Sequence, residues 1–452
     1  MKQAASLAKL TRPKSANVLI RKRLFKLLDE ARSYPVIWIT APPGAGKTTL
    51  ISSYIETRKI NNLWYQIDEG DGDIASFFHY MGIAAKQAAP RYRKSLPNLT
   101  PEYLQGLPTF TRNYFRELYS RVNPSVSPLT KGGIKRGVSK SGFAIVFDNY
   151  QDVPADSQLH EIMQTGLSEI PDGINVIIIS RTDPPSAFAG LRANNRMNIL
   201  SWNELKLSSE ETSGIVQLKV LKKLSKEVIQ ELHAKTNGWA AGLVLMLEHQ
   251  GSADLMQRHG DGFTTQAMFD YFAGEIFQKL DAASQEILLQ TAFLPIMTAR
   301  LAQQLTGSHQ AGELLAELNR RNYFTTRKSL PDPVYQYHPL FREFLLAQAR
   351  QQLTAAQLVQ TMRHAAEILE STGQAEDAII LYSHAEDWES MARLILTHAQ
   401  TMITQGRNQM VEDWIKQMPE SVVNETPWIL YYLGVCRLPF NPAKAREDFE
   451  KI

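Results

Sequence analysis

The first 205 residues alternate short apolar runs with stretches of helical periodicity. The runs are rich in β-branched and aromatic residues and are bounded by turn residues, as strands are. They cover residues 35–40, 63–67, 143–147 and 175–180, with 197–200 as a candidate fifth. Because each run is apolar at consecutive positions, it predicts a strand that is buried on both faces. Such strands are typical of a parallel sheet with helices on either side, so we expect an α/β domain.

A polar segment interrupts this pattern at residues 121–142, which are rich in Pro, Ser, Gly and Lys. Such a segment has little to bury, and we expect it to be an exposed, mobile loop. Exposed loops of small and polar residues are also preferred sites of limited proteolysis.

From Ser208 onward the pattern becomes helical. A serine followed by the acidic Glu210 and Glu211 is typical of a helix start, and Asn237 with Gly238 predicts a helix break. Helical periodicity returns at residues 239–247, 268–280, 283–291 and 311–320. Two strand-like runs then flank a turn that contains proline, at residues 323–326 and 334–337. Helices followed by a hairpin predict a winged-helix unit.

The remaining sequence, from Thr354, repeats the order helix, short turn, helix. One pair covers residues 364–371 and 374–384 on either side of Gly373, and 443–452 begins another. Such pairs predict a helical superhelix of the TPR-like kind, in which each pair needs stacked neighbours and the last one a polar cap. Because no polar cap is visible at the end, we expect the array to continue past these residues or to be completed by a partner.

Composition narrows the class of protein further. A length of 452 residues suggests about three domains, and 44% hydrophobic with 21% charged residues is ordinary for a globular chain. The formal net charge of +3 is too small for a nucleic-acid coat or a membrane-surface protein. A single cysteine, Cys436, excludes an internal disulfide and a zinc finger built from thiolates. With no secretory signal and no apolar run of ~18 residues, we expect a cytoplasmic protein that does not contact the membrane.

One motif has specific chemistry. Ala41-Pro-Pro-Gly-Ala-Gly46-Lys47-Thr48 follows the first apolar run and precedes a helical stretch at 49–58. A glycine-rich loop in this position binds phosphate through its backbone N–H groups, while its lysine reaches the β- and γ-phosphates and its threonine binds Mg²⁺. The alternative is that the glycines form an ordinary turn beside an unrelated lysine. Such a turn would need neither a strand directly before it nor a helix directly after it. We therefore expect ATP or ADP with Mg²⁺ to bind at Gly44, Ala45, Gly46, Lys47, Thr48 and Thr49.

Two polar residues at the ends of later runs complete the predicted site. A phosphate-binding loop needs an acidic residue on a neighbouring strand for Mg²⁺, and Asp148 directly follows the run at 143–147. Arg181 follows the run at 175–180 and is a candidate sensor of the γ-phosphate, the alternative being an ordinary surface arginine. The predicted fold class is thus a P-loop NTPase of the ASCE type, with a parallel sheet, followed by a helical domain, a winged helix and a TPR-like superhelix.

The order of several short motifs resembles the maltose-regulon activator (MalT-like) family, whose members are STAND signal-transduction ATPases related to the NB-ARC proteins. No single later motif is specific, but the ordered set is. The set comprises Lys9-Leu-Thr-Arg-Pro13, Val18-Leu-Ile-Arg21-Lys-Arg23-Leu24, Trp64-Tyr-Gln-Ile-Asp68-Glu-Gly-Asp71, the Asp148 strand, Ser180-Arg181, Leu191-Arg192, Asn237-Gly-Trp239 and Tyr337-His-Pro-Leu-Phe341.

The resemblance implies four domains and a switch. The domains would be a nucleotide-binding domain at 1–205, a helical domain at 206–260, a winged-helix domain at 261–350 and a helical arm with the start of a superhelix at 351–452. In the family, ADP holds a closed monomer, whereas inducer and ATP favour an open form that self-associates.

The resemblance also assigns residues and partners. His338 would contact the β-phosphate of ADP, although it could instead be a core histidine in an aromatic cluster, and Val18 and Arg23 would lie against the adenine. A small-molecule or protein inducer would bind the helical C-terminal region. DNA would be contacted only through a C-terminal effector that is not among these residues.

The sequence departs from the family at the hydrolytic site. Asp148 is followed by Asn149, where the family has a second aspartate. Asparagine can orient a water molecule but cannot accept its proton, although Asp152 could substitute if the chain curls back. With Asp148, Asn149 and Arg181 as the candidate catalytic residues, we expect a slow ATPase that serves as a regulatory switch.

Three functions remain open from the sequence. The first is the ATPase switch of a MalT-like transcriptional activator. The second is a STAND switch in another signalling or defence protein with a different effector. The third, a metabolic P-loop enzyme such as a kinase, is disfavoured because no motif for an acceptor substrate is visible and the second half is repeat-like.

Overall fold

The chain folds into two compact units, which are described separately: Met1–Leu99 with Tyr103–Phe269, and Thr100–Glu102 with Asp270–Ile452. The computed structural model describes residues 8–13, 18–122, 142–219, 224–248, 273–274, 277–320, 324–329 and 333–452. Residues 123–141 of the loop predicted at 121–142 and most of the helix predicted at 268–280 therefore lie outside the described residues, while Arg121 and Val122 are helical rather than part of a loop.

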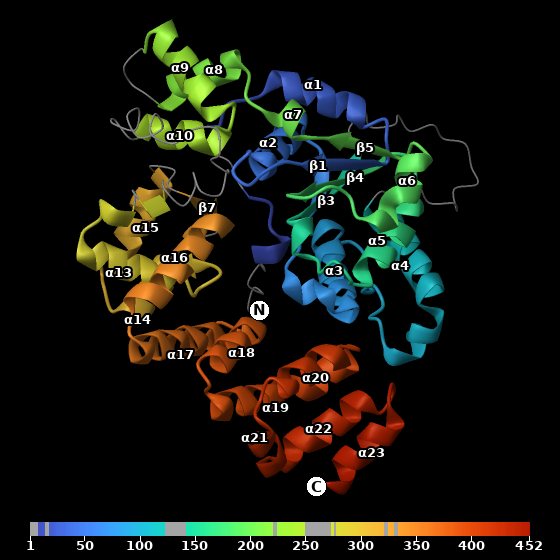
Figure 1. The fold of residues 1–452 in the computed structure, drawn as a ribbon. Coiled ribbons are helices and arrows are strands. Elements are labelled where there is room, and N and C mark those ends of the chain that lie inside the picture. The colour runs from blue at the N-terminus through green and yellow to red at the C-terminus, as the bar shows by residue number, and fades with distance from the viewer. Residues whose placement is uncertain are drawn as a thin grey trace. The chain divides into compact units, whose positions relative to one another are not determined.

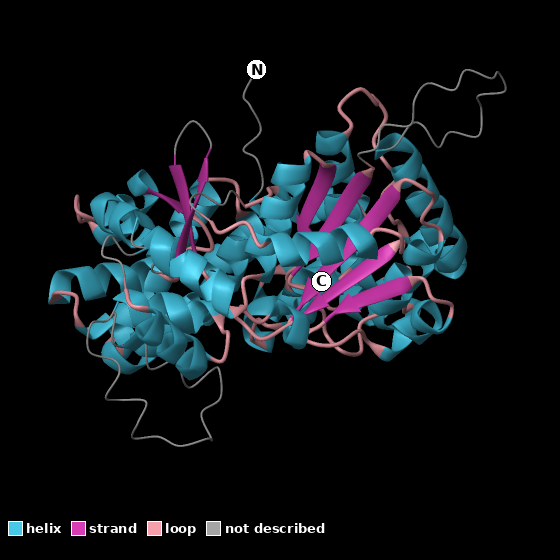
Figure 2. Cartoon of the chain, turned by 90° about the horizontal axis from the view of Figure 1, so that it is seen from above, coloured by secondary structure: helices cyan, strands magenta, loops and turns pink. Residues whose placement is uncertain are grey.

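The first unit contains a five-stranded parallel sheet (Figures 1 and 2). Its strands are β1 (Val36–Thr40), β2 (Asn61–Gln66), β3 (Phe143–Asp148), β4 (Ile174–Ser180) and β5 (Met197–Leu200). The sheet order is β2-β3-β4-β1-β5. Every apolar run predicted to be a strand, the candidate fifth included, forms one, and the α/β fold class is confirmed.

Helices cover both faces of this sheet because its strands direct apolar side chains to both sides. Ile37 and Ile39 of β1 join the core beneath α1 (Lys22–Ala31) and α2 (Lys47–Arg58). Val36 and Trp38, at the alternate positions, pack in the opposite core. That core is covered by α3 (Ile74–Ala88), α4 (Leu107–Val122) and α5 (Leu159–Ser168). Two short helices, α6 (Ala189–Ala193) and α7 (Trp202–Leu205), come before and after β5 and contact it.

A buried ion cluster holds the N-terminal segment against this unit. Lys9, in the short helix η1 (Ala8–Leu10), lies 2.8 Å from both Asp68 and Asp71. The Tyr65 hydroxyl donates a 2.7 Å hydrogen bond to Asp71, which is completely buried. Burial raises the pKa of Asp71 to about 6, although Lys9 opposes the shift. The pairing thus compensates the desolvation of a carboxylate inside the unit.

A small helical bundle follows the sheet within the same unit. It contains α8 (Ser209–Lys219), α9 (Lys226–Thr236) and α10 (Ala240–Glu248) around a core that includes Val216 and Leu243. Asn237 and Gly238, the predicted break, both have positive φ, 47° and 75°, and separate α9 from α10. No helix among the described residues is long and apolar enough to cross a bilayer.

The second unit begins with helices and a three-stranded antiparallel sheet of order β6-β8-β7. The predicted hairpin corresponds to β7 and β8, so the winged-helix pattern is confirmed. The elements are α13 (Ala282–Thr291), β6 (Met297–Thr298), α14 (Ala299–Thr306), α15 (Ala311–Arg320), β7 (Thr325–Ser329), β8 (Pro333–Tyr337) and α16 (Pro339–Gln352).

Helix pairs complete the second unit (Figure 1). Gly373 and Gly406, with φ of 79° and 83°, end the first helices of successive pairs, a spacing close to the ~34-residue period of tetratricopeptide repeats. Arg437 joins later helices through ion pairs of 2.9 Å to Glu412 and 2.8 Å to Asp448. The helices are α17 (Ala355–Ser371), α18 (Ala375–His384), α19 (Trp388–Thr404), α20 (Asn408–Lys416), α21 (Glu420–Glu425), α22 (Pro427–Arg437) and α23 (Pro442–Glu450).

Packing between α4 and α5 generates a stability prediction. A Cβ added to Gly166 of α5 would lie 2.6 Å from the ring of Phe115 in α4. We expect Gly166→Ala to lower the free energy of unfolding by about 1–3 kcal/mol, because overpacking outweighs the ~1 kcal/mol that alanine gains in a helix. The matched control is Gly190→Ala in α6, where no atom lies within 4 Å of the added Cβ. Equal stability of the two variants in urea unfolding would contradict this prediction.

Candidate nucleotide-binding site

The residues predicted to bind phosphate and Mg²⁺ meet because three neighbouring strands end at the same edge of the sheet. β4 lies between β1 and β3, with Thr40 paired to Ser180 and Phe147 paired to Ile178. The glycine-rich loop follows β1, Arg181 follows β4, and Asp148 ends β3. The carboxyl edge of a parallel sheet is where α/β proteins bind ligands.

The loop after β1 leads directly into α2. Gly44 and Gly46 adopt the left-handed conformation, with φ of 72° and 82°, which glycine permits without strain. Gly46 is the N-cap of α2, and Lys47, Thr48 and Thr49 form its first turn. The N–H groups of a first helical turn have no partner inside the helix, so they can bind an anion.

Lys47 is buried at the start of α2, with 8% of its surface exposed. Its Nζ donates hydrogen bonds of 2.6 Å to the carbonyl of Ala41 and 3.1 Å to that of Pro42. Burial, together with the charge of Arg181, lowers the pKa of Lys47 to about 8, while Asp148 opposes the shift. Arg181 follows β4, the strand next to β1, so the two cationic residues belong to the same edge of the sheet.

Thr48 and Asp148 meet across the same site. The Thr48 hydroxyl donates a 3.1 Å hydrogen bond to Oδ1 of Asp148, which is 4% exposed. A hydroxyl and a carboxylate are hard oxygen ligands of the kind that Mg²⁺ takes beside nucleotide phosphates. Among the described residues no cluster of three or more His, Cys, Asp or Glu side chains could hold a metal. The pair supplies two hard oxygen ligands, and the binding of Mg²⁺ here stays a prediction.

The residue after Asp148 has an unusual backbone. Asn149 has a φ of 64°, a region that asparagine tolerates better than most residues, and its N–H donates to Oδ1 of Asp148 at 3.1 Å. Two residues on, the side-chain oxygen of Gln151 accepts a 3.1 Å hydrogen bond from the backbone N–H of Arg181. Its side-chain nitrogen donates a 3.0 Å hydrogen bond to the carboxylate of Asp152. Burial raises the pKa of Asp152. The turn after β3 thus brings Asp152 back toward Arg181.

The segment before α1 contacts the helical bundle. Leu19 packs against α8, where a Cβ on Gly214 would lie 2.8 Å from its side chain. Val18 beside it is half-buried. Arg23 donates hydrogen bonds to the carbonyls of Glu204 at 2.8 Å and Lys206 at 2.9 Å. The proximity of Val18 and Arg23 to an adenine stays a prediction.

His338 belongs to the second unit. It is the N-cap residue of α16, and its backbone N–H donates to the carbonyl of Phe324. Its imidazole lies against the ring of Phe324, with 6.1 Å between the ring centroids. The aromatic surroundings match the alternative of a core histidine, and the predicted contact with ADP stays a prediction.

Sequence reasoning gave no role to two contacts of this site. Trp239 donates from its indole nitrogen to the carbonyl of Pro43 at 2.8 Å. Arg21, which is buried, donates at 2.8 Å to Glu211, whose position had indicated only a helix start. Both residues lie in motifs that resemble the MalT-like family, and that resemblance was the only pattern that could have drawn attention to them.

The parallel sheet, its strand order and the glycine-rich loop define the first unit as a P-loop NTPase fold. Residues 273–357 match the family described as MalT winged helix domain, and residues 15–181 match the family described as Nephrocystin 3, N-terminal. Both matches agree with the order of domains in the chain.

Two curated relatives extend this similarity along the chain. Each is named HTH-type transcriptional regulator MalT, from a strain of Klebsiella pneumoniae, and is 25% identical over 429 residues. The matched part is 94% of this chain and 45% of each relative, so the chain spans less than half their length. These matches confirm the resemblance to MalT that the ordered motifs predict.

Two solved structures are also similar to this chain. A Walker-type ATPase of Pyrococcus abyssi is 13% identical and has a TM-score of 0.32, over 74% of this chain and 98% of that one. ORC1 of Aeropyrum pernix, solved in complex with DNA, is 13% identical with a TM-score of 0.30.

The lowered pKa of Lys47 predicts how nucleotide affinity depends on pH. Below pH 8 the amine is already charged, whereas above it a proton must be taken up when phosphate binds. We expect the Kd for ADP to rise by up to about tenfold per pH unit above pH 8. Isothermal titration calorimetry at pH 7 to 9.5, in buffers of different protonation enthalpy, measures both effects.

Two variants control this experiment. Lys47→Ala should lose tight binding at every pH, and Lys47→Arg should bind with a flat profile, because a guanidinium stays charged over this range. A wild-type protein with a flat profile and no proton uptake would show that Lys47 does not titrate against phosphate.

Proposed function

We propose that this chain is the nucleotide-dependent switch of a STAND signal-transduction ATPase that resembles the MalT transcriptional regulators. The observation that supports this most is the similarity to MalT, which runs without a change of order across 94% of the chain. The P-loop geometry supports nucleotide as the ligand, and the winged helix with its following helix pairs supports regulation over metabolism.

The residues at the carboxyl edge of the sheet would each bind a different part of the ATP or ADP complex with Mg²⁺. The N–H groups from Gly44 to Thr49 would bind the phosphates, and Lys47 would neutralise them once it leaves its loop carbonyls. Thr48 and Asp148 would hold Mg²⁺, which when bound neutralises phosphate charge. Arg181, whose charge already influences Lys47, would stabilise charge on the terminal phosphate.

Regulation would follow from unequal affinity for two states of the protein. We propose that ADP, held in part by His338, Val18 and Arg23, favours a closed monomer and that ATP with an inducer favours an open form that self-associates. A ligand shifts such an equilibrium only by its differential affinity for the two forms. Control of transcription would then depend on a DNA-binding region outside these residues.

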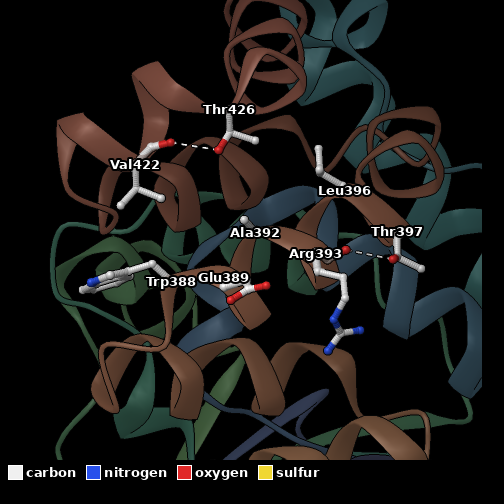
Figure 3. Close-up of a pocket in the computed structure, with 8 residues that line it drawn as sticks. All are labelled: Trp388, Glu389, Ala392, Arg393, Leu396, Thr397, Val422 and Thr426. Atoms are coloured by element: carbon white, nitrogen blue, oxygen red, sulfur yellow. Dashed lines mark hydrogen bonds between the residues drawn. The ribbon is translucent and has the colours of Figure 1, made fainter.

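A groove in the helix pairs is a candidate site for the inducer. Figure 3 shows residues of α19 on one side and of α21 with the turn after it on the other. Its volume, about 740 Å³, is in the range of sites for small molecules. The groove is lined by an aromatic ring, a carboxylate and a guanidinium, from Trp388, Glu389 and Arg393. Arg393 also forms a 2.7 Å ion pair with Glu370. We propose that a small molecule or a peptide binds here.

The second candidate function differs from the first only in the effector that the switch controls. The same switch could serve a signalling or defence protein that does not control transcription. The similarity to a transcriptional regulator favours the first function, and it also supports the proposal of a cytoplasmic location.

The switch predicts the state of the purified protein. We expect ADP to be released when the protein is denatured, and His338→Ala to increase the self-associated fraction in ATP, because the closed form loses a contact. Chromatography identifies the nucleotide, and light scattering measures the mass. His309→Ala, an exposed histidine in the same domain, is the control. Nucleotide-free protein together with equal masses for both variants would rule out the closed switch.

The turn after β3 predicts slow hydrolysis. Asn149 cannot accept a proton, so we expect Asn149→Asp to speed up single-turnover ATP hydrolysis by roughly 10²-fold or more. Asp152→Ala should slow it, because burial raises the pKa of Asp152 and makes it the better base. Asp156→Ala, which removes an exposed carboxylate nearby, should change nothing. Rapid wild-type turnover with no gain in Asn149→Asp would refute this assignment.

A further inference from the structure

The helical bundle (α8, α9 and α10) forms hydrogen bonds with backbone carbonyl groups of the phosphate-binding loop. The indole N–H of Trp239 donates to the carbonyl of Pro43 at 2.8 Å, and the backbone N–H of Ala241 donates to the carbonyl of Gly44 at 3.0 Å. Trp239 is 3% exposed. A loop of the sheet domain is thus fixed by two donors from the start of α10.

The approach between loop and bundle is very close. A Cβ on Gly44 would lie 2.6 Å from Cβ of Ala241 and 2.9 Å from the indole nitrogen of Trp239. On its other side the indole ring lies against Gly242, where a Cβ would be 2.4 Å from a ring carbon. Both glycines thus leave room for the indole ring, and the hydrogen bond to Pro43 fixes the direction of its N–H.

These carbonyl contacts determine where the loop directs its N–H groups. A peptide group is planar and trans, so its C=O and N–H point in opposite directions. The carbonyls of Pro43 and Gly44 belong to the peptide groups that carry the N–H of Gly44 and Ala45, and the Ala45 N–H donates to the carbonyl of Pro42 at 3.3 Å within the loop. Holding the two oxygens toward the bundle therefore restricts the orientation of donors in the loop that would bind phosphate.

The bundle is in turn fixed to the rest of the unit. The N–H of Leu207 donates to the carbonyl of Gly238 at 2.9 Å, just before Trp239. The same linker is held by Arg21, which donates to the carbonyls of Leu205 at 2.8 Å and Lys206 at 2.9 Å. A continuous set of hydrogen bonds therefore joins the loop, the bundle and the segment before α1.

We propose that Trp239 is a positioning residue, which shapes the loop for phosphate through the Pro43 carbonyl and couples nucleotide binding to the helical bundle. This inference rests on the proposed nucleotide function. The coupling is reciprocal: a contact that strengthens nucleotide binding is itself strengthened by nucleotide to the same factor. A phosphate ligand at the sheet edge would thus tighten the bundle on the opposite side of the loop.

The test compares two tryptophan variants. Trp239→Phe keeps an aromatic ring but removes the N–H donor, and we expect the Kd for ADP to rise by about 3- to 10-fold, as for one lost hydrogen bond. Trp64→Phe is the matched control, since Trp64 is also 3% exposed and its indole nitrogen makes no hydrogen bond. It should leave the Kd unchanged. Calorimetry measures both, and equal Kd values for Trp239→Phe and wild type would overturn the proposal.

A second measurement uses the wild-type protein and does not depend on a stable variant. Hydrogen–deuterium exchange should slow at residues 239–243 when ADP is added, because the N–H of Ala241 is one of the two donors. Unchanged exchange there, in protein that binds ADP, would refute the coupling while leaving the nucleotide function intact. Wild-type protein that binds no nucleotide would instead refute the proposed function itself.

Discussion

The order of three parallel strands is the constraint on which the site depends. Because β4 pairs with β1 on one side and with β3 on the other, the segments after all three strands meet at one edge. Those segments contain the glycine-rich loop, Arg181 and Asp148. An order with another strand inserted between them would leave the same residues on the same strand ends but move them apart by ~4.8 Å for each inserted strand.

This convergence creates an electrostatic strain that a phosphate would relieve. Lys47 and Arg181 are brought close enough that the arginine contributes to lowering the pKa of the lysine to about 8, with burial as the larger cause. Asp148 compensates only in part. A polyanion bound between these side chains would favour the charged lysine, so the burial that makes the free site unfavourable for a cation would also favour a bound phosphate.

The linker between the sheet and the helical bundle connects several parts of the first unit. Arg21 and Arg23 both reach Lys206 and Glu211, and the turn at Gly238 bonds to Leu207. Burial by itself would raise the pKa of Glu211, but the pKa is lowered overall, mainly because Arg21 donates to the carboxylate. Because this linker joins the segment before α1 to the bundle that touches the phosphate loop, a movement of one requires a change in the others.

The sequence by itself determined the strands, the phosphate loop and the winged-helix hairpin, because each depends on residues that are adjacent in the chain. Short runs of consecutive apolar, β-branched residues between turn residues are typical of a strand buried on both faces, and the turn into α2 needs glycine at positive φ. The contact of Trp239 with Pro43, 196 residues away, and that of Arg21 with Glu211, 190 residues away, were decided by tertiary structure alone. These long-range hydrogen bonds form only when the bundle packs on the sheet. A local sequence pattern does not show which distant donor will meet which carbonyl or carboxylate.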